Sequence, residues 1–385
     1  MSNTYVITDY GVIPGISELQ TVQIQAVLDL CKTGGGTVVI PAGTYRMAGV
    51  RMWSDTTIYL QSGATLVGSS ECDDYEIIMP PDGMLMRNDV EMFKDYNEGR
   101  EFPNYRRAMI SAYGEKNIAI IGEENTMIDG SDCYDPVGEE NFRGPHGIYI
   151  TNCENVTLRG YTIGHSGNFM HQADLCRGIT MQNVTCLGGH DGIHLHYCVD
   201  TLIENCLMET GDDCIAGCNI RNLTVRNCKL NTSCNFFRIG GIHMLIEDCH
   251  MYGPGVYPHR MTVVKGKHDV LPREGGRHNS LGLMHYFGSR LYPDTEPARD
   301  IVFRNCRAEN FEALMYWTSG EICQVGEFAE CVFENMHISG VRRPSRLKAN
   351  EAVPLRVYLK NVTVEGGTPA DLVGTESFNT EFVIE

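Results

Sequence analysis

The sequence contains no uninterrupted run of eighteen apolar residues, so it predicts no membrane-spanning helix. Its first residues, 1–5, lack the basic stretch and apolar segment of a secretory signal, so a cytosolic protein is expected unless a leader has been removed. No two of the sixteen cysteines have C-x-x-C spacing, which leaves a zinc site of that kind with little support. In a chain of 385 residues without a signal, we expect the cysteines to be reduced and buried. We expect no metal and no other cofactor.

Basic residues are also in the minority. Lys and Arg total 31 against 49 Asp and Glu, for a net charge of −18. Such a protein repels phosphate backbones and anionic lipids, so neither nucleic acid nor a membrane is an expected partner. A long polyanionic substrate is disfavoured for the same reason, although a local basic contact could still bind one.

What the chain does contain is a short recurring unit of β-branched or apolar residues, then Asn or Asp, then a small apolar residue. The central positions Asn183, Asn205, Asn227 and Asp248 are 22, 22 and 21 residues apart. A period this short, with no amphipathic helix between units, predicts stacked coils of parallel strands. We therefore predict an all-β fold, a single-stranded right-handed parallel β-helix forming one domain over residues 1–385.

The residue after each central Asn or Asp is predicted to point into the core, and the central residues themselves to bond from coil to coil as a ladder. The core positions read Val184, Cys206, Cys228, Cys249, Cys306, Met336 and Val362. Because free Cys packs as a small buried hydrophobe, we interpret these cysteines as packing residues rather than redox groups.

A solenoid has to cover its open ends. Residues 17–33 carry apolar side chains at helical spacing before three glycines, which predicts a short capping helix over the first coil. Two segments, 73–107 and 253–298, break the repeat and are rich in Pro, Gly, Arg, Asp and aromatic residues. We interpret both segments as loops that wall a groove.

Acidic residues recur with the same period. His190 and Asp191 follow Asn183 by seven and eight residues, as Asp212 and Asp213 follow Asn205. Neighbouring coils lie about 4.8 Å apart, so His190 should lie over Asp212 and Asp191 over Asp213. Carboxylates this close cannot all stay ionised, so at least one pKa should rise. An acid that holds a proton beside an ionised base is what glycosidic cleavage needs. Ordinary turn residues are the alternative interpretation, and two registered sites argue against it.

The motifs Asp191-Gly192-Ile193 and Gly211-Asp212-Asp213-Cys214-Ile215-Ala216 resemble those of the polygalacturonases, family 28 of the glycoside hydrolases. Residues 8–11 and 35–45 are similar to the start of many β-helix carbohydrate enzymes, lyases included. The resemblance covers most of residues 5–365 and implies hydrolysis with inversion. It implies that Asp212 protonates the leaving oxygen and that Asp191 and Asp213 activate the attacking water. Close spacing alone would instead indicate retention.

The sequence departs from this family where the substrate is recognised. Gly189-His190 replaces an Asn-Thr pair, and Asn235, 22 residues after Asp213, replaces a histidine. The family's Arg-Ile-Lys motif has no clean match. Its role could pass to Arg238, which could equally be a surface residue paired with an acid. The expected substrate-binding residues are therefore His190, His194, Asn235, Arg238, Lys265 and Lys267.

His194 and His196 alternate on one strand face near Asp191. Such pairs occur in zinc and iron sites, but polar residues that line a groove and bind sugar hydroxyls are commoner. We keep the second interpretation.

The leading hypothesis is an inverting glycosidase that removes units from the end of a short, α-linked, pectic oligosaccharide. An imported substrate would be short, and the two long loops could close a groove into a pocket. A β-helix polysaccharide lyase is the first alternative, and it would need a calcium-binding acidic cluster and a basic residue. A non-catalytic carbohydrate-binding solenoid is the second.

Overall fold

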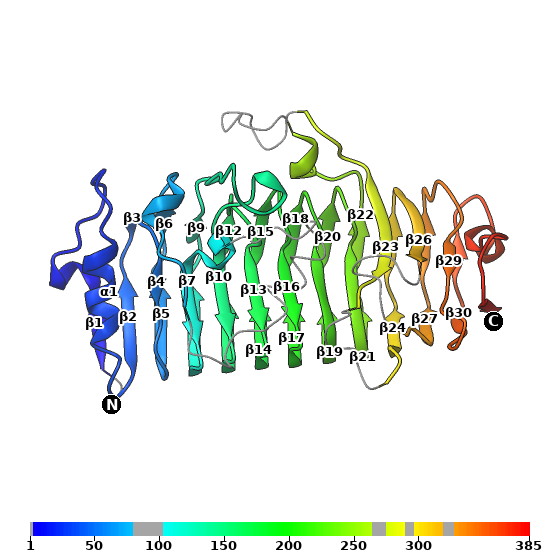
Figure 1. Cartoon of the computed structure of the whole chain (residues 1–385), viewed down its shortest axis with the longest axis horizontal. Coiled ribbons are helices and arrows are strands. Elements are labelled where there is room, and N and C mark those ends of the chain that lie inside the picture. The colour runs from blue at the N-terminus through cyan, green and yellow to red at the C-terminus, as the bar shows by residue number, and fades with distance from the viewer. Residues whose placement is uncertain (1–2, 80–102, 264–274, 289–295, 319–326) are drawn as a thin grey trace.

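The computed structural model describes residues 3–79, 103–263, 275–288, 296–318 and 327–385. These residues form a stack of coils that follow one another along the long axis, with strands that run across this axis, the N-terminal coils at one end and the C-terminal coils at the other (Figure 1). The strands pair in parallel from coil to coil, as between β13 (His171–Asp174) and β16 (Ile193–His196). The fold is the predicted right-handed parallel β-helix.

The described strands form two sheets, one of 21 strands and one of 11 strands. The larger also contains β1 (Thr4–Val6), β2 (Gly36–Ile40), β4 (Val50–Arg51), β5 (Thr56–Leu60), β7 (Ala108–Tyr113), β8 (Lys116–Gly122), β10 (His146–Thr151), β11 (Glu154–Arg159), β14 (Arg177–Gln182), β17 (Val199–Glu204), β19 (Ile215–Arg226), β21 (Phe237–Glu247), β23 (Ser280–Tyr286), β24 (Arg299–Arg304), β26 (Phe311–Thr318), β27 (Glu330–Glu334), β29 (Arg346–Lys348), β30 (Leu355–Lys360) and β32 (Thr380–Ile384). The smaller contains β3 (Gly43–Met47), β6 (Ala64–Gly68), β9 (Met127–Asp129), β12 (Thr162–Gly164), β15 (Thr185–Gly188), β18 (Leu207–Thr210), β20 (Lys229–Thr232), β22 (His250–Tyr252), β25 (Arg307–Glu309), β28 (His337–Ser339) and β31 (Thr363–Val364).

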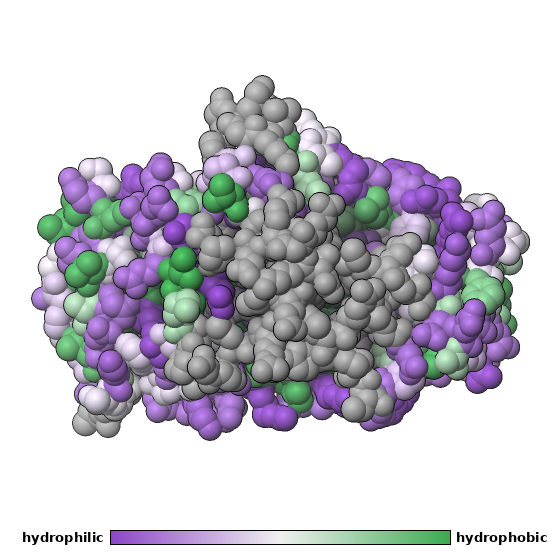
Figure 2. Space-filling view, in the orientation of Figure 1, coloured by the Kyte–Doolittle hydropathy of each residue, from purple (hydrophilic) through white to green (hydrophobic). Residues whose placement is uncertain are grey.

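The helices are α1 (Thr21–Asp29) and the short 3-10 turns η1 (Ile7–Tyr10), η2 (Cys72–Asp74), η3 (Pro103–Arg106), η4 (Glu139–Asn141), η5 (Arg260–Thr262) and η6 (Pro369–Leu372). No helix in the described ranges is long and apolar enough to cross a membrane. On the face shown in Figure 2, most coloured residues are hydrophilic and the hydrophobic ones lie scattered in small groups.

The recurring Asn and Asp residues turn the chain between strands. Asn183, Asn205, Asn227 and Asp248 all have φ between 53° and 55°, the left-handed conformation that Asn and Asp tolerate best. Among the C-terminal coils the predicted side-chain ladder is present, because Asn335 donates to Asn305 at 3.0 Å and Asn361 donates to Asn335 at 2.9 Å. The turn residues thus lock the coil register.

The residues after these turns are buried as predicted, from Val184 at 0% to Val362 at 7% exposed. The cysteines at these positions carry free thiols inside the core. Of the fifteen cysteines that the structure describes, fourteen are buried and Cys72 is partly exposed. The packing interpretation of the cysteine repeat is confirmed for these residues.

The capping helix is shorter than predicted. It begins at Thr21, because Gln20 is tied to its surroundings: its backbone N–H donates to Arg46 O at 2.8 Å and its side chain exchanges two hydrogen bonds with the backbone of Ile13. Val22 and Leu30, which the helical pattern assigned to the apolar face, are 78% and 41% exposed.

The segment 253–298 is not loop throughout. Residues 280–286 form β23, which pairs with β21 and β26 as part of a regular coil. The prediction was wrong here because the flanking polar residues masked an apolar stretch of which Leu283 and Met284 are fully buried. Parts of both predicted loops, 80–102, 264–274 and 289–295, lie outside the described residues.

Candidate active site

Two successive coils bring the predicted acidic residues together, and a third coil adds Asn235. Pairing of β15 with β18 and of β16 with β19 sets a shift of 22 residues, so His190 lies over Asp212 and Asp191 over Asp213, as predicted. A carboxylate oxygen from each of Asp191, Asp212 and Asp213 lies within 4.8 Å of the others. The next coil places Asn235 beside Asp213, as the spacing also predicted.

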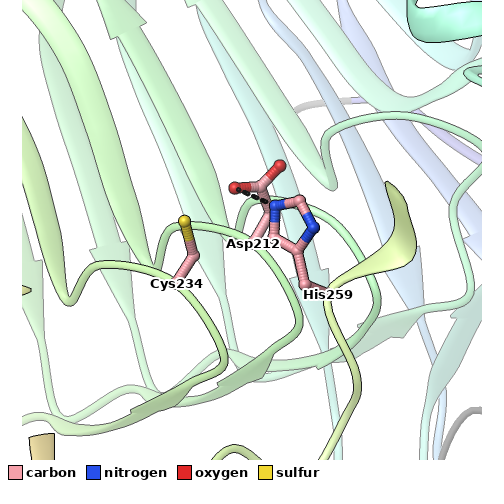
Figure 3. Close-up of side chains that lie close together, drawn as sticks. All are labelled: Asp212, Cys234 and His259. Carbon is pink, nitrogen blue, oxygen red and sulfur yellow. Dashed lines mark ion pairs between the residues drawn. The ribbon is translucent and has the colours of Figure 1, made fainter. Parts of the chain in front are cut away.

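Asp212 is the most exposed of the three acids and is paired with two basic groups. Its Oδ2 lies 2.8 Å from Nη2 of Arg143, and its Oδ1 lies 3.5 Å from Nε2 of His259 (Figure 3). Burial alone would raise the pKa of Asp212, but His259 and Arg143 together hold it well below its usual range. Asp212 is therefore ionised in this state.

The pKa values of Asp191 and Asp213 are shifted in the opposite direction, upward. Burial, then the negative charges of Asp212 and Asp213, raises the pKa of Asp191 well above its usual range. Burial and Asp212 also raise the pKa of Asp213, although Arg238 lies 3.9 Å away and Asn235 donates two hydrogen bonds of 3.0 and 2.8 Å to Asp213 Oδ1. The predicted rise of at least one carboxyl pKa is present. It falls on Asp191 and Asp213, whereas the residue to which the resemblance assigns the transferable proton, Asp212, carries the charge here.

Besides His259, which has the larger effect on the pKa of Asp212, the cause is Arg143, which sequence reasoning missed. It follows η4, and its guanidinium contacts Glu140 at 2.7 Å and Glu139 at 3.8 Å as well as Asp212. It also lies 3.3 Å from Asn168 Oδ1 and 3.2 Å from His190 Nδ1. Counting one coil of 22 residues back from His190 reaches Asn168, so part of this network carried a sequence signal.

His259 was missed as well, because it lies on an irregular segment with no period. Gly211 allows that segment to approach Asp212, since a Cβ at position 211 would lie 2.1 Å from the carbonyl oxygen of Pro258. Only the absence of a side chain at Gly211 brings the imidazole of His259 within reach of Asp212.

Among the predicted substrate-binding residues, Asn235 lies beside Asp213 as described above, and the surroundings of the others differ. His190 is buried against Phe142 and Arg143, and burial and Arg143 hold its pKa well below the usual range, so it supports the cluster as a neutral ring. Arg238 has a side chain 25% exposed and lies with its guanidinium 4.6 Å from the ring centre of Phe287, beside Asp213. Lys265 and Lys267 lie outside the described residues.

His194 and His196 project from β16 away from the core. His194 Nδ1 lies 2.8 Å from Asp191 Oδ2, and His196 Nδ1 lies 3.0 Å from Asp174 Oδ1. His194 is thus hydrogen bonded directly to one of the three clustered acids, a contact that the sequence did not predict.

Two sets of side chains in the described part of the chain are close enough to hold a cation. One is Asp191, Asp212 and Asp213, and the other is Asp212, Cys234 and His259, shown in Figure 3. Both include Asp212, whose Oδ2 is already paired with a guanidinium, and Arg238 lies beside Asp213. Because these fixed positive charges oppose a cation, the clusters suit protons and an anionic ligand better than a metal, and we assign none to them.

Comparisons with known proteins define first the class: solved structures with this fold include exopolygalacturonases. A hyperthermoactive exopolygalacturonase of Thermotoga maritima aligns with a TM-score of 0.72 at 14% identity, over 100% of this chain and 91% of that one. A family 28 exopolygalacturonase of Yersinia enterocolitica aligns with a TM-score of 0.66 at 16% identity, over 100% and 78%. At these identities the likeness establishes the fold.

The sequence then defines the family. Residues 5–256 match the family model "Rhamnogalacturonase A/epimerase, pectate lyase-like", so the chain belongs to that family. A probable polygalacturonase of Vitis vinifera is 25% identical over 229 residues, and an exo-poly-alpha-D-galacturonosidase of Dickeya chrysanthemi is 33% identical over 126 residues. The matches cover 54% and 32% of this chain but only 43% and 19% of those relatives. The resemblance to polygalacturonases inferred from the aspartate motifs is confirmed.

Proposed function

We propose that this protein is a glycoside hydrolase that releases terminal galacturonic acid units from short pectic oligosaccharides, with inversion at the anomeric carbon. The observation that carries the proposal is the cluster of three carboxyl groups with divided charge, Asp212 ionised and Asp191 with a raised pKa. An acid and a base side by side are what hydrolysis of a glycosidic bond requires.

In the proposed reaction Asp212 donates a proton to the leaving oxygen as the bond from the anomeric carbon breaks. Water attacks that carbon and gives its proton to Asp191 or Asp213, so one proton is donated and one is recovered. Asp212 is assigned the role of proton donor to the leaving group because its side chain is the most exposed, at 14%, against 3% for Asp191 and 2% for Asp213.

The resting charge distribution has to change before this reaction begins. The three carboxyl groups lie within 4.8 Å of one another, so they titrate as a coupled set, and a proton that Asp191 holds at rest can pass to Asp212 when the surrounding charges change. An anionic sugar brought near Arg143 and Arg238 weakens their pull on the carboxylates and raises the pKa of Asp212. Substrate binding would therefore favour the reactive arrangement.

A uronic acid substrate is supported by the side chains beside the acids. The strand register aligns one outward row across neighbouring coils, Tyr149, Gln172, His194, Ala216, Arg238 and His285. This row contains no acidic residue and includes Arg238 beside Asp213, although the whole chain is strongly acidic. Arg238 offers a planar pair of donors suited to a carboxylate.

Action from a chain end is supported by burial. The side chains of Asp191 and Asp213 are only 3% and 2% exposed, so their surroundings suit one terminal residue better than the middle of a polymer. The relative from Dickeya chrysanthemi also carries an exo-acting name.

The test is digestion of polygalacturonate, short galacturonate oligomers, rhamnogalacturonan oligomers and neutral galactosides, followed by viscosity, product size and ultraviolet absorbance together. Steady release of monosaccharide at nearly constant viscosity supports the proposal. A fast fall in viscosity with mid-sized products would refute exo action, and absorbance from unsaturated products would identify a lyase. Binding without any cleavage would indicate a non-catalytic solenoid.

A further inference from the structure

Two histidines on β16 face away from the core although both are buried. Ile193 and Leu195 belong to the hydrophobic core, so the alternate residues His194 and His196 project from the opposite face of the strand. Their ring centres are 4.5 Å apart in an edge-to-face arrangement. With side chains 7% and 3% exposed, they are enclosed to the same degree as Asp191 at 3%.

Each imidazole is held by a carboxylate through Nδ1. Asp174, which contacts His196, also accepts hydrogen bonds from Tyr149 Oη at 3.0 Å and Gln172 Nε2 at 2.5 Å. Because an ionised carboxylate only accepts, His196 donates through Nδ1–H and a neutral ring keeps its lone pair on Nε2. The same holds for His194 whenever Asp191 is ionised.

The second nitrogen of each ring is the feature that needs an explanation. Within the described ranges, neither His194 Nε2 nor His196 Nε2 has a hydrogen-bond partner, although both atoms are buried. Burial, then His196 and Arg238, holds the pKa of His194 well below its usual range, so this ring is neutral. When Asp191 is ionised and both rings are neutral, the two buried Nε2 atoms are adjacent acceptors without donors; this arrangement is costly, and a ligand that supplies the donors would remove that cost.

We infer that His194 and His196 form a subsite that accepts hydrogen bonds from two hydroxyl groups of one sugar ring. The aromatic ring of Phe169 stacks on His194 with centres 4.5 Å apart, and Phe287 lies 6.0 and 6.2 Å from the two imidazoles, so apolar surfaces lie close to both. The lone pairs on the two Nε2 atoms would repel a carboxylate. This subsite therefore binds hydroxyl groups, while Arg238 binds the carboxylate of the sugar. The inference rests on the proposed function and adds the basis of its sugar specificity.

The contact with Asp191 gives His194 a second role, as a positioning residue. A donor 2.8 Å from Asp191 Oδ2 fixes the orientation of that carboxyl group. A hydroxyl bound at His194 Nε2 is then held in a defined place relative to Asp191. Recognition of the sugar and orientation of the acid group thus depend on one ring.

The test uses His196→Asn, because the amide nitrogen of Asn can take the place of Nδ1 beside Asp174 while the distal acceptor is lost. We expect kcat/KM on a galacturonate disaccharide to fall about 10- to 100-fold, the effect of one buried unpaired group. Analogues that lack O2, O3 or O4 of the terminal ring are compared on wild type and variant. For one of these analogues, kcat/KM of the wild type should be about 10- to 100-fold lower than on the parent disaccharide. The variant should hydrolyse that analogue and the parent disaccharide with the same kcat/KM.

His243→Asn is the matched control, since His243 Nδ1 makes the same kind of contact to Asp300 at 2.6 Å but is half exposed. It should retain wild-type kinetics. If His196→Asn does not fold, the deoxy analogues on the wild type still decide, because retention of full kcat/KM with all three overturns the subsite. The subsite is also overturned if His196→Asn lowers kcat/KM, relative to the wild type, by the same factor on the parent disaccharide and on all three deoxy analogues. If the wild type hydrolyses no galacturonate oligomer, the proposed function itself fails.

Discussion

Glu139 gives the sharpest test of the electrostatics around the candidate site. Its carboxyl is 8% exposed, and its Oε2 lies 3.8 Å from Arg143 Nε with no hydrogen bond among the described residues. Burial, opposed by Arg143 and reinforced by Glu140 and Asp212, raises the pKa of Glu139 from 4.5 to about 8. The substitution Glu139→Gln removes the ionisation and keeps the shape of the protonated acid.

The sign of the effect follows from proton linkage. Because the pKa is higher in the folded protein, the folded state binds the Glu139 proton more tightly. This contribution to stability is complete below about pH 4.5 and is lost as the pH rises through about 8. A pKa difference between 4.5 and about 8 corresponds to about 5 kcal/mol, which is an upper figure because a charged site relaxes and admits water.

The measurement is the free energy of unfolding in urea between pH 5 and pH 9. Wild type and Glu139→Gln should be equally stable at pH 5 to within about 1 kcal/mol, and the variant should become the more stable of the two by several kcal/mol at pH 9. The exposed residue Glu351 provides the control Glu351→Gln, which should follow wild type throughout. A difference between Glu139→Gln and wild type that does not change with pH would refute the reasoning.

Three further predictions concern the chemistry and the core. Asp212→Asn should lower turnover of oligosaccharides by about 10²–10⁴-fold without loss of fold. The decrease should be smaller with an aryl galacturonide, because its leaving group needs no proton. The surface variant Asp200→Asn should have the turnover of the wild type. Proton NMR of the first product should show the anomer opposite to that of the substrate bond; the retained anomer would exclude single displacement. Maleimide followed by mass spectrometry should modify Cys72 in the native protein and leave Cys206 and Cys228 unmodified until it unfolds, because the core positions are shielded; rapid native labelling of either would contradict the register.

The repeat made the fold and the carboxylate cluster predictable. In stacked parallel coils, residues one period apart in sequence are neighbours in space, so a count of 22 residues sufficed to place Asp191 over Asp213 and Asn235 after them. The same regularity identified Cys206 and Cys228 as core residues.

Position along a repeat says nothing about side chains that reach across coils from irregular segments. Arg143 and His259 lie outside the period, and only the tertiary structure brings them to Asp212. His259 and Arg143 lower the pKa of Asp212 and so reverse the protonation expected of it, because the pKa of a buried carboxyl depends on all the charges and hydrogen bonds around it. The bond from His194 to Asp191 had the same origin, since a side-chain direction within one coil cannot be counted from sequence. The sequence alone therefore determined which acids meet, and the tertiary structure decided which of them holds the proton.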